Sequence, residues 1–581
     1  MHIMKTRLML TFLIAVMVLS MAPSVSFAQA VDSVVVAALP PGNLNSVIMG
    51  DTLANGLRVN PNRVYVLQQT GATDTVYFLT SAIQMRANLH LVGKVNPVTG
   101  HPPVLEPMIA ADNSSVGTFF NPLGGDTVSV KGLYILGTRT DGSSVTGICF
   151  GAGGDSVTYY ADHCVIENIG SGGTPNIVNT WNTQHINLYF TNCEFRNNQD
   201  DVPQNPGIAW VDPGTYPLDT AVFVNNTFFI FGGTCIGSGG YCGYIRFEHN
   251  TVFMTTKGGA FTIPQLWNAV IRNNIYYGVN SAGLDTGHVN DAAVYNANFY
   301  TAPAVIELDS LSTLKGTPYN ITEAMRNITV TKNAYFWPQE VIANWQTLNA
   351  NGSGTTYGQI VPTIWQASTD PAILTDRTRW PGISVTSNDS TDPGFNASLV
   401  TNAADSMVHF VNTIWNTGGG SGDRPFLYST DPSNKFANVP SNWAATQGYP
   451  VPENLRYSNT ALQHAGTDGK ALGDLNWFPE QLATGVAEKS NSVPTSFALS
   501  QNYPNPFNPT TTIEYSIPRA SLVTLKVYNL LGQEVASLVN QEQKASSYSV
   551  RFDASRLSSG VYFYQIQAGS FSLTKKMLLL K

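Results

Sequence analysis

Three short stretches with one shared pattern decide the fold: FVNNTF at 223–228, FEHNTV at 247–252 and IRNNIY at 271–276. Each has an apolar residue, two variable residues, an asparagine, one more variable residue and a second apolar residue. The starts are 24 residues apart, which leaves room for about three short strands with their turns, the size of one rung of a parallel β-helix. A repeat of this length predicts a solenoid.

The same pattern recurs on both sides of this block. It occupies 128–133, 160–165, 190–195 and 330–335, with Lys131, His163, Cys193 and Asn333 at the polar position. We expect the polar position to form one inward column, in which Asn226, Asn250 and Asn274 hydrogen-bond along the stack, because an amide carries both a donor and an acceptor. The pattern also predicts a satisfied inward role for His163 rather than a catalytic one. A β-sandwich with accidental similarity is the alternative.

Further stretches carry a resemblance to a known architecture. Residues 65–67, 76–79, 89–93 and 102–105 are similar to the opening rungs of right-handed, pectin-lyase-like parallel β-helices, and Asp392-Pro393-Gly394-Phe395 is similar to a phrase that often closes them. The resemblance spans about 45–480 and implies an all-β, right-handed parallel β-helix solenoid. It implies no particular activity, because one fold hosts many functions.

Residues 336–480 are less regular. We expect long loops and final rungs here, packed over the helix and capping its open end. Tryptophan can stack on sugar rings, but we expect most of these side chains to pin loops to the scaffold. Seven of the ten tryptophans lie in this stretch: Trp337, Trp345, Trp365, Trp380, Trp415, Trp443 and Trp477.

The N-terminus is typical of a signal peptide. Lys5 and Arg7 precede an apolar run from Leu8 to Leu19, and Ala28-Gln29-Ala30 is a small-x-small cleavage site. The mature chain is then expected to begin at Val31. An uncleaved membrane anchor is the alternative, although the apolar run is short for a span and no later segment is long enough for one.

Composition excludes one class of partner. The net charge is −8 and only 12% of residues are charged, so no basic patch is available to meet a phosphate backbone. Export permits disulfides among the five cysteines. Cys235 and Cys242 flank a glycine-rich run and can close a small loop, whereas Cys164 and Cys193 are predicted to be buried thiols. The odd count leaves at least one cysteine free, and no spacing suggests zinc.

The C-terminal residues carry a second resemblance. QNYPNPFNPTT at 501–511, VYNLLGQEV at 527–535, SGVYFY at 559–564 and TKKM at 574–577 strongly resemble the type A sorting domain of type IX secretion. We expect a β-helix domain at 31–481, a linker at 482–494 and a small β-sandwich at 495–581. The resemblance implies recognition by the outer-membrane export machinery, removal of the domain and a cell-surface or secreted product. The landmark residues are Gly532, Gly560, Lys575 and Lys576.

Candidate active-site residues are few. Glu248 and Arg272 are expected in one column of neighbouring rungs, with Arg246 and Lys257 nearby, and they can form a lyase base with its partners. They can equally form a surface cross-strand pair. Asp200 and Asp201 resemble the acidic pair of polygalacturonases and are substrate-binding candidates, but the other landmarks of that family are absent. A solvated loop is the simpler interpretation.

Two functions remain open. The first is a secreted or surface β-helix that binds extracellular polysaccharide or acts as an adhesin without a cofactor. The second is a polysaccharide lyase acting on a uronate-containing glycan, for which calcium is a candidate cofactor. Nine Asp-Ser/Thr-x triplets also resemble bacterial O-glycosylation sites, or simply mark turns entering strands. They begin at Asp32, Asp51, Asp74, Asp126, Asp155, Asp219, Asp309, Asp389 and Asp405.

Overall fold

The computed structural model divides the chain into two compact units, Asp32–Pro479 and a C-terminal unit that begins at Glu480. The structure describes residues 32–53, 57–69, 74–85, 87–108, 116–137, 148–151, 153–169, 177–179, 183–198, 209–211, 218–231, 235–238, 242–255, 260–262, 266–281, 304–308, 322–350, 363–366, 371–410, 412, 453–482, 487–488, 497–499, 502, 505, 507, 510–519, 521–530, 532–543, 546–554, 557–569 and 571–579.

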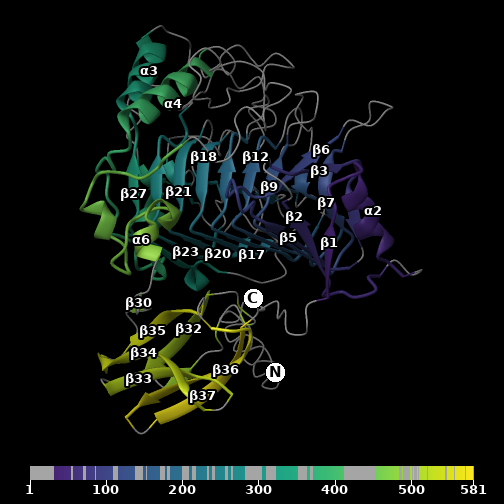
Figure 1. Ribbon diagram of the computed structural model, residues 1–581. Coiled ribbons are helices and arrows are strands. Elements are labelled where there is room, and N and C mark those ends of the chain that lie inside the picture. The colour runs from purple at the N-terminus through teal and green to yellow at the C-terminus, as the bar shows by residue number, and fades with distance from the viewer. Residues whose placement is uncertain are drawn as a thin grey trace, which may run out of the picture. The chain divides into compact units, whose positions relative to one another are not determined.

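The first unit is a parallel β-helix built from three sheets, which the chain visits in turn (Figure 1). Sheet A has eleven strands: β1 (Ser33–Val36), β2 (Val64–Gln68), β5 (Leu89–Lys94), β8 (Thr127–Lys131), β11 (Thr158–Asp162), β14 (Ile186–Thr191), β17 (Leu218–Val224), β20 (Cys242–Glu248), β23 (Asn268–Arg272), β26 (Asn327–Thr331) and β29 (Ile383–Thr386). The parallel pairing of each strand with the next in this order confirms the predicted solenoid.

The other two sheets have nine strands each. Sheet B holds β3 (Val76–Leu79), β6 (Val104–Pro107), β9 (Tyr134–Leu136), β12 (Val165–Glu167), β15 (Glu194–Arg196), β18 (Thr227–Phe231), β21 (Thr251–Thr255), β24 (Ile275–Tyr277) and β27 (Ala334–Phe336). Sheet C holds β4 (Ile83–Met85), β7 (Thr118–Pro122), β10 (Ile148–Phe150), β13 (Val178–Asn179), β16 (Ala209–Val211), β19 (Ile236–Ser238), β22 (Phe261–Thr262), β25 (Ala304–Glu307) and β28 (Thr363–Gln366). Their inward side chains form one continuous apolar core.

Short helices complete this unit. α2 (Asn43–Gly50) buries Leu44 and Ile48 in the core beside the first rung, and α3 (Gln339–Ala350) packs against α4 (Ala397–Phe410) (Figure 1). Among its described residues, the remaining helical turns are η3 (Glu323–Met325), η4 (Pro371–Leu374), η6 (Leu462–His464) and η7 (Leu475–Trp477). α6 (Pro479–Leu482) begins at the last residue of this unit. Among the described residues, the helices are too short or too polar to cross a membrane.

The predicted asparagine ladder is confirmed. Nδ2 of Asn226 donates to Oδ1 of Asn250 at 2.9 Å, and Nδ2 of Asn250 donates to Oδ1 of Asn274 at 3.1 Å. The ladder continues from Asn274 to Asn333 at 2.8 Å and from Asn333 to Asn388 at 2.9 Å. Each of these Oδ1 atoms also accepts the backbone N–H of the preceding ladder residue. The column therefore provides hydrogen-bond acceptors for the backbone N–H groups of the buried turn on successive rungs.

The column differs from the prediction at its first two positions. β8 and β11 pair Lys131 with Asp162, which places both side chains on the outer face, so the inward positions belong to Leu133 and Cys164. His163 lies in the left-handed turn with φ 53°, and its side chain is 59% exposed. The inward assignment was wrong because the pattern took the large Tyr160 for the inward apolar residue, whereas the small Ala161 fills that place.

Residues 453–478, here called the strap, lie on the outer face of sheet B across β15, β18 and β21. The guanidinium of Arg196 donates to both carboxylate oxygens of Glu453, at 2.6 and 2.8 Å. Further along the sheet, Thr227 donates to Oδ2 of Asp474 at 2.7 Å and accepts from Nε1 of Trp477 at 2.8 Å. The strap thus lies along the side of the helix rather than over its open end.

Most of the described tryptophans anchor loops, as expected. Nε1 of Trp337 donates to the carbonyl of Val279 at 2.7 Å, and Nε1 of Trp345 donates to the carbonyl of Ser281 at 2.8 Å. Nε1 of Trp380 reaches Glu323 at 2.6 Å. Trp415 and Trp443 lie outside the described residues.

The C-terminal unit contains two four-stranded sheets, with an antiparallel arrangement in both. One holds β30 (Ala487–Glu488), β31 (Ala498–Leu499), β32 (Thr510–Ile517) and β35 (Ser546–Asp553), and the other holds β33 (Ser521–Tyr528), β34 (Glu534–Gln543), β36 (Gly560–Ala568) and β37 (Phe571–Leu579). Side chains of both sheets share one apolar core, as the predicted β-sandwich requires.

The ladder predicts a position-dependent stability effect. We expect Asn250→Ala to lower the free energy of unfolding by about 1–3 kcal/mol, because the buried amides of Asn226 lose their acceptor. Asn388→Ala, at the half-exposed end of the ladder, should cost less because water can replace the lost bond. Chemical denaturation of the full chain measures both. Equal losses for the two variants would contradict this role of the column.

Candidate functional site

The outer face of sheet A carries two rows of side chains that the strand register brings together. The row nearer the strand starts contains Ser129, Tyr160, Tyr189, Val222, Arg246, Val270 and Thr329. The row nearer the strand ends contains Lys131, Asp162, Thr191, Val224, Glu248, Arg272 and Thr331. Both rows point outward because side chains alternate between the two faces of a strand.

An aromatic pair stands in the first row. The rings of Tyr160 and Tyr189 stack with centroids 4.8 Å apart and planes 12° from parallel, and both side chains are half-buried. The next residues in this row are Ser129 on one side and Val222 on the other, and both are smaller than tyrosine. The outer face of each ring therefore borders a small side chain. Sequence reasoning missed this pair, because it treated Tyr160 as an inward residue.

A charged cluster lies two rungs further along. The carboxylate of Glu248 accepts from Nη2 of Arg246 at 2.7 Å and from Nε of Arg272 at 2.8 Å. The structure therefore brings together three of the four predicted catalytic residues, while Lys257 lies outside the described residues. Burial by itself would raise the pKa of Glu248, but the two guanidinium groups outweigh it and hold that pKa at about 2. An ionised carboxylate held by two cations is a poor general base near neutral pH.

A second polar cluster surrounds Asp162. Its carboxylate accepts from Nζ of Lys131 at 2.8 Å, Oγ1 of Thr191 at 2.9 Å and Nδ2 of Asn192 at 2.9 Å, and it contacts Nδ1 of His163 at 2.8 Å. Burial opposes ionisation, yet His163 and Lys131 keep the pKa of Asp162 below its ordinary value. This cluster fixes the imidazole of His163 at the rim of the outer face. The sequence signal for this cluster is the alternation of inward and outward residues along β11 and β14, which places Asp162 and Thr191 on the outer face.

The remaining predicted residues of the β-helix are two acidic residues and two cysteines. Asp200 and Asp201 lie outside the described residues. Cys235 and Cys242 are free, buried thiols, placed just before β19 of sheet C and at the start of β20 of sheet A. The suggested bond between them is not present.

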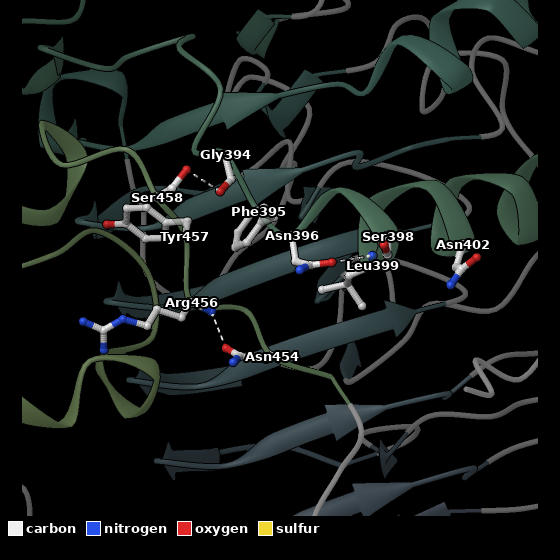
Figure 2. A pocket seen from close by; sticks show the side chains of 10 residues that line it. All are labelled: Gly394, Phe395, Asn396, Ser398, Leu399, Asn402, Asn454, Arg456, Tyr457 and Ser458. Atoms are coloured by element: carbon white, nitrogen blue, oxygen red, sulfur yellow. Dashed lines mark hydrogen bonds between the residues drawn. The ribbon is translucent and has the colours of Figure 1, made fainter. Parts of the chain in front are cut away.

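A hollow of about 640 Å³ lies between the start of α4 and the start of the strap (Figure 2). Its apolar side includes Phe395, whose ring meets Tyr277 edge-on at 5.1 Å. The amide oxygens of Asn396 and Asn454 are held by the backbone N–H groups of Leu399 and Arg456, at 3.1 and 2.9 Å. The sequence did not indicate this hollow, because it forms only where the strap returns to the residues after Gly394.

The buried charges beneath the strap have a structural role. Arg196 also pairs with Glu167, which accepts from Tyr134 and from Nδ2 of Asn197. Burial and the neighbouring Glu453 raise the pKa of Glu194 well above its ordinary value. Arg196, Glu167 and Glu453 are almost fully enclosed, so they tie the strap to sheet B and offer no surface to a ligand.

Comparison with known proteins identifies the C-terminal unit. Residues 501–580 match the family described as the secretion system C-terminal sorting domain. The C-terminal unit is a type IX secretion sorting domain. The chain is therefore a secreted protein, exported to the cell surface or beyond by type IX secretion. No curated protein matches the chain.

The sorting domain places its predicted landmark residues on its second sheet and the adjoining turns. Gly532 has φ 78° in the turn between β33 and β34, where its N–H donates to the carbonyl of Asn529 at 3.0 Å. Gly560 begins β36, and Lys575 and Lys576 lie on β37, opposite Tyr564 and Phe563. A part for these four residues in export remains a prediction.

The paired Glu248 predicts a defined pH dependence. Its pKa falls from an ordinary value of 4.5 to about 2, so its contribution to stability is complete above pH 4.5 and is lost as the pH drops towards 2. We expect Glu248→Gln to destabilise the β-helix at pH 7 by an amount on the order of 2 kcal/mol. This difference from the wild type should shrink towards pH 2. A difference that does not change with pH, in denaturation series at several pH values, would contradict the ion-pair account.

Proposed function

We propose that the β-helix of this secreted protein binds extracellular polysaccharide along the outer face of sheet A, as a surface-binding or adhesive module. The half-exposed Tyr160–Tyr189 stack carries the proposal. Half-exposed aromatic rings offer apolar contact area at low entropic cost and keep a polar hydroxyl at the tip. An exported protein meets such polymers outside the cell.

The rest of the face supplies polar groups at regular intervals. Successive rungs lie about 4.8 Å apart, so hydroxyl, amide and guanidinium groups repeat along the direction in which a polymer would run. Val222 stands between Tyr189 and Arg246 in the first row. A sugar ring seated above Val222 would place its C–H face on the tyrosine and its hydroxyls near the guanidinium. Water can bridge the wider gaps.

The pairing of Glu248 favours binding over a lyase reaction at this face. β-Elimination needs a group that is free to take a proton near neutral pH. Here the carboxylate is ionised but held by Arg246 and Arg272. The same pairing fixes both guanidinium groups in orientation, which suits recognition of a polymer.

The proposal predicts loss of binding when the stack is removed. Using the full chain and a panel of immobilised neutral and acidic polysaccharides, we expect at least one polymer to retain the wild type. Tyr160→Ala and Tyr189→Ala should each weaken that retention about 5- to 30-fold, since losing one aromatic contact costs roughly 1–2 kcal/mol. Tyr528→Ala, a half-buried tyrosine of the sorting domain, is the matched control.

Two results would count against it. If no polysaccharide in the panel retains the wild type, the proposed function fails. If a polymer binds and both sheet A variants bind as well as Tyr528→Ala, the binding surface lies elsewhere on the molecule.

We also propose O-glycosylation at the Asp-Ser/Thr-x triplets whose hydroxyls are accessible. Ser33, Thr52, Ser156 and Ser390 are exposed, whereas Ser406 is buried in α4 and donates to the carbonyl of Asn402 at 2.7 Å. We expect hexose mass on peptides carrying the four exposed residues and none on the Ser406 peptide of native protein. Unmodified peptides at all four exposed sites, in a mass-spectrometric map, would refute this.

A further inference from the structure

The inward ladder column changes chemistry at one end. From Asn226 onward the column is made of amides, but the two preceding rungs place Cys193 and then Cys164 at the same position. Both thiols are buried and belong to the apolar core. Two cysteines thus occupy adjacent rungs of a column that is linked side chain to side chain from Asn226 to Asn388.

The register places these cysteines directly over one another. Asp162 pairs with Thr191 just before them, and Val165 pairs with Glu194 just after them. Adjacent parallel strands lie about 4.8 Å apart, which is inside the roughly 4.4–6.8 Å that separates the Cα atoms of bonded cysteines. From that spacing, closing a bond would bring the two Cβ atoms together by about 0.3–1.3 Å, because bonded cysteines have Cβ atoms about 3.5–4.5 Å apart.

The two thiols also share one orientation. Sγ of Cys164 lies 3.5 Å from the carbonyl of Asp162, and Sγ of Cys193 lies 3.2 Å from the carbonyl of Thr191, each two residues back along the chain. The side chains therefore point the same way into the core. Cys149, in β10 of sheet C, and Cys235 and Cys242 have no cysteine partner in strand register.

The polar ladder stops at this point. The backbone N–H of Cys193 donates to Oδ1 of Asn226 at 2.8 Å. The Cys193 side chain has no amide group, so it cannot extend the row of amide–amide hydrogen bonds. Between rungs β11–β12 and β14–β15 the side chains of Cys164 and Cys193 interact with each other, in place of the amide–amide bond that joins every later pair from Asn226 to Asn388.

We propose that Cys164 and Cys193 form an inter-rung disulfide in the exported protein and continue the ladder covalently. The step is a thiol–disulfide exchange with a disulfide-carrying oxidant of the export compartment. The two thiols lose two protons and two electrons, one S–S bond forms between them, and the disulfide of the oxidant is reduced to a dithiol. In the structure both cysteines are in the reduced state.

Because both thiols are buried in the folded protein, the disulfide must form before folding is complete. Exchange requires a thiolate, and the surrounding core raises the pKa of the Cys193 thiol well above its ordinary value. The folded, reduced protein should therefore resist oxidation. The bond is expected to form while the chain folds after export, before the turns pack.

The test maps the cysteines of the protein recovered from the extracellular or cell-surface fraction. The protein is denatured in an alkylating agent without reductant, digested and analysed by mass spectrometry. We expect a linked peptide pair that joins Cys164 to Cys193, with Cys149, Cys235 and Cys242 alkylated as internal controls. A Cys149→Ser variant should keep the link, and in Cys193→Ser the residue Cys164 should become alkylated.

Two outcomes would overturn the proposal. Alkylation of all five cysteines would show that Cys164 and Cys193 remain buried thiols. A bond that joins Cys164 to Cys149, or any other pair, would show that the register does not select the partner. If Cys193→Ser fails to fold, the map of the wild-type protein decides between these results without it.

Discussion

The in-register stacking of parallel rungs is the constraint on which the rest of this molecule depends. Every buried turn must satisfy its backbone N–H groups, and the ladder from Asn226 to Asn388 does so with one amide on each rung. Once the turn is fixed, the strands before it and after it are held in register. The outward side chains of sheet A are then placed in rows, and the strap can bind along sheet B.

The outer faces of sheets A and B, which lie before and after the ladder turn, differ in what covers them. On the sheet B side the strap buries the outer face, through Arg196 and Glu453 at one end and Thr227 and Asp474 further along. On the sheet A side the stacked tyrosines and the guanidinium groups of Arg246 and Arg272 remain partly exposed, while the carboxylate of Glu248 is buried between those two groups. In the proposed function a polymer would meet sheet A, while sheet B serves the stability of the fold.

Local patterns were enough to predict much of this architecture. The asparagines recur in one short motif, and the sorting domain has its own landmarks, so both could be recognised without any long-range information. The strap could not, because its bonds join residues about 250 positions apart, such as Thr227 and Asp474. Tyr160 and His163 were misplaced because a small inward alanine, Ala161, does not mark the strand register. The sequence therefore predicted the charged part of the candidate face, at Glu248, but not its aromatic part, at Tyr160 and Tyr189.

Hydrogen–deuterium exchange of the full-length protein, with and without a polysaccharide that it retains, tests the central claim most directly. Slow exchange is expected wherever a bound polymer covers a strand and reduces its local opening. The account predicts added protection in peptides that cover β11, β14, β17 and β20. Protection confined to residues around Gly394 and Asn454, or to the sorting domain, with sheet A unchanged, would contradict it.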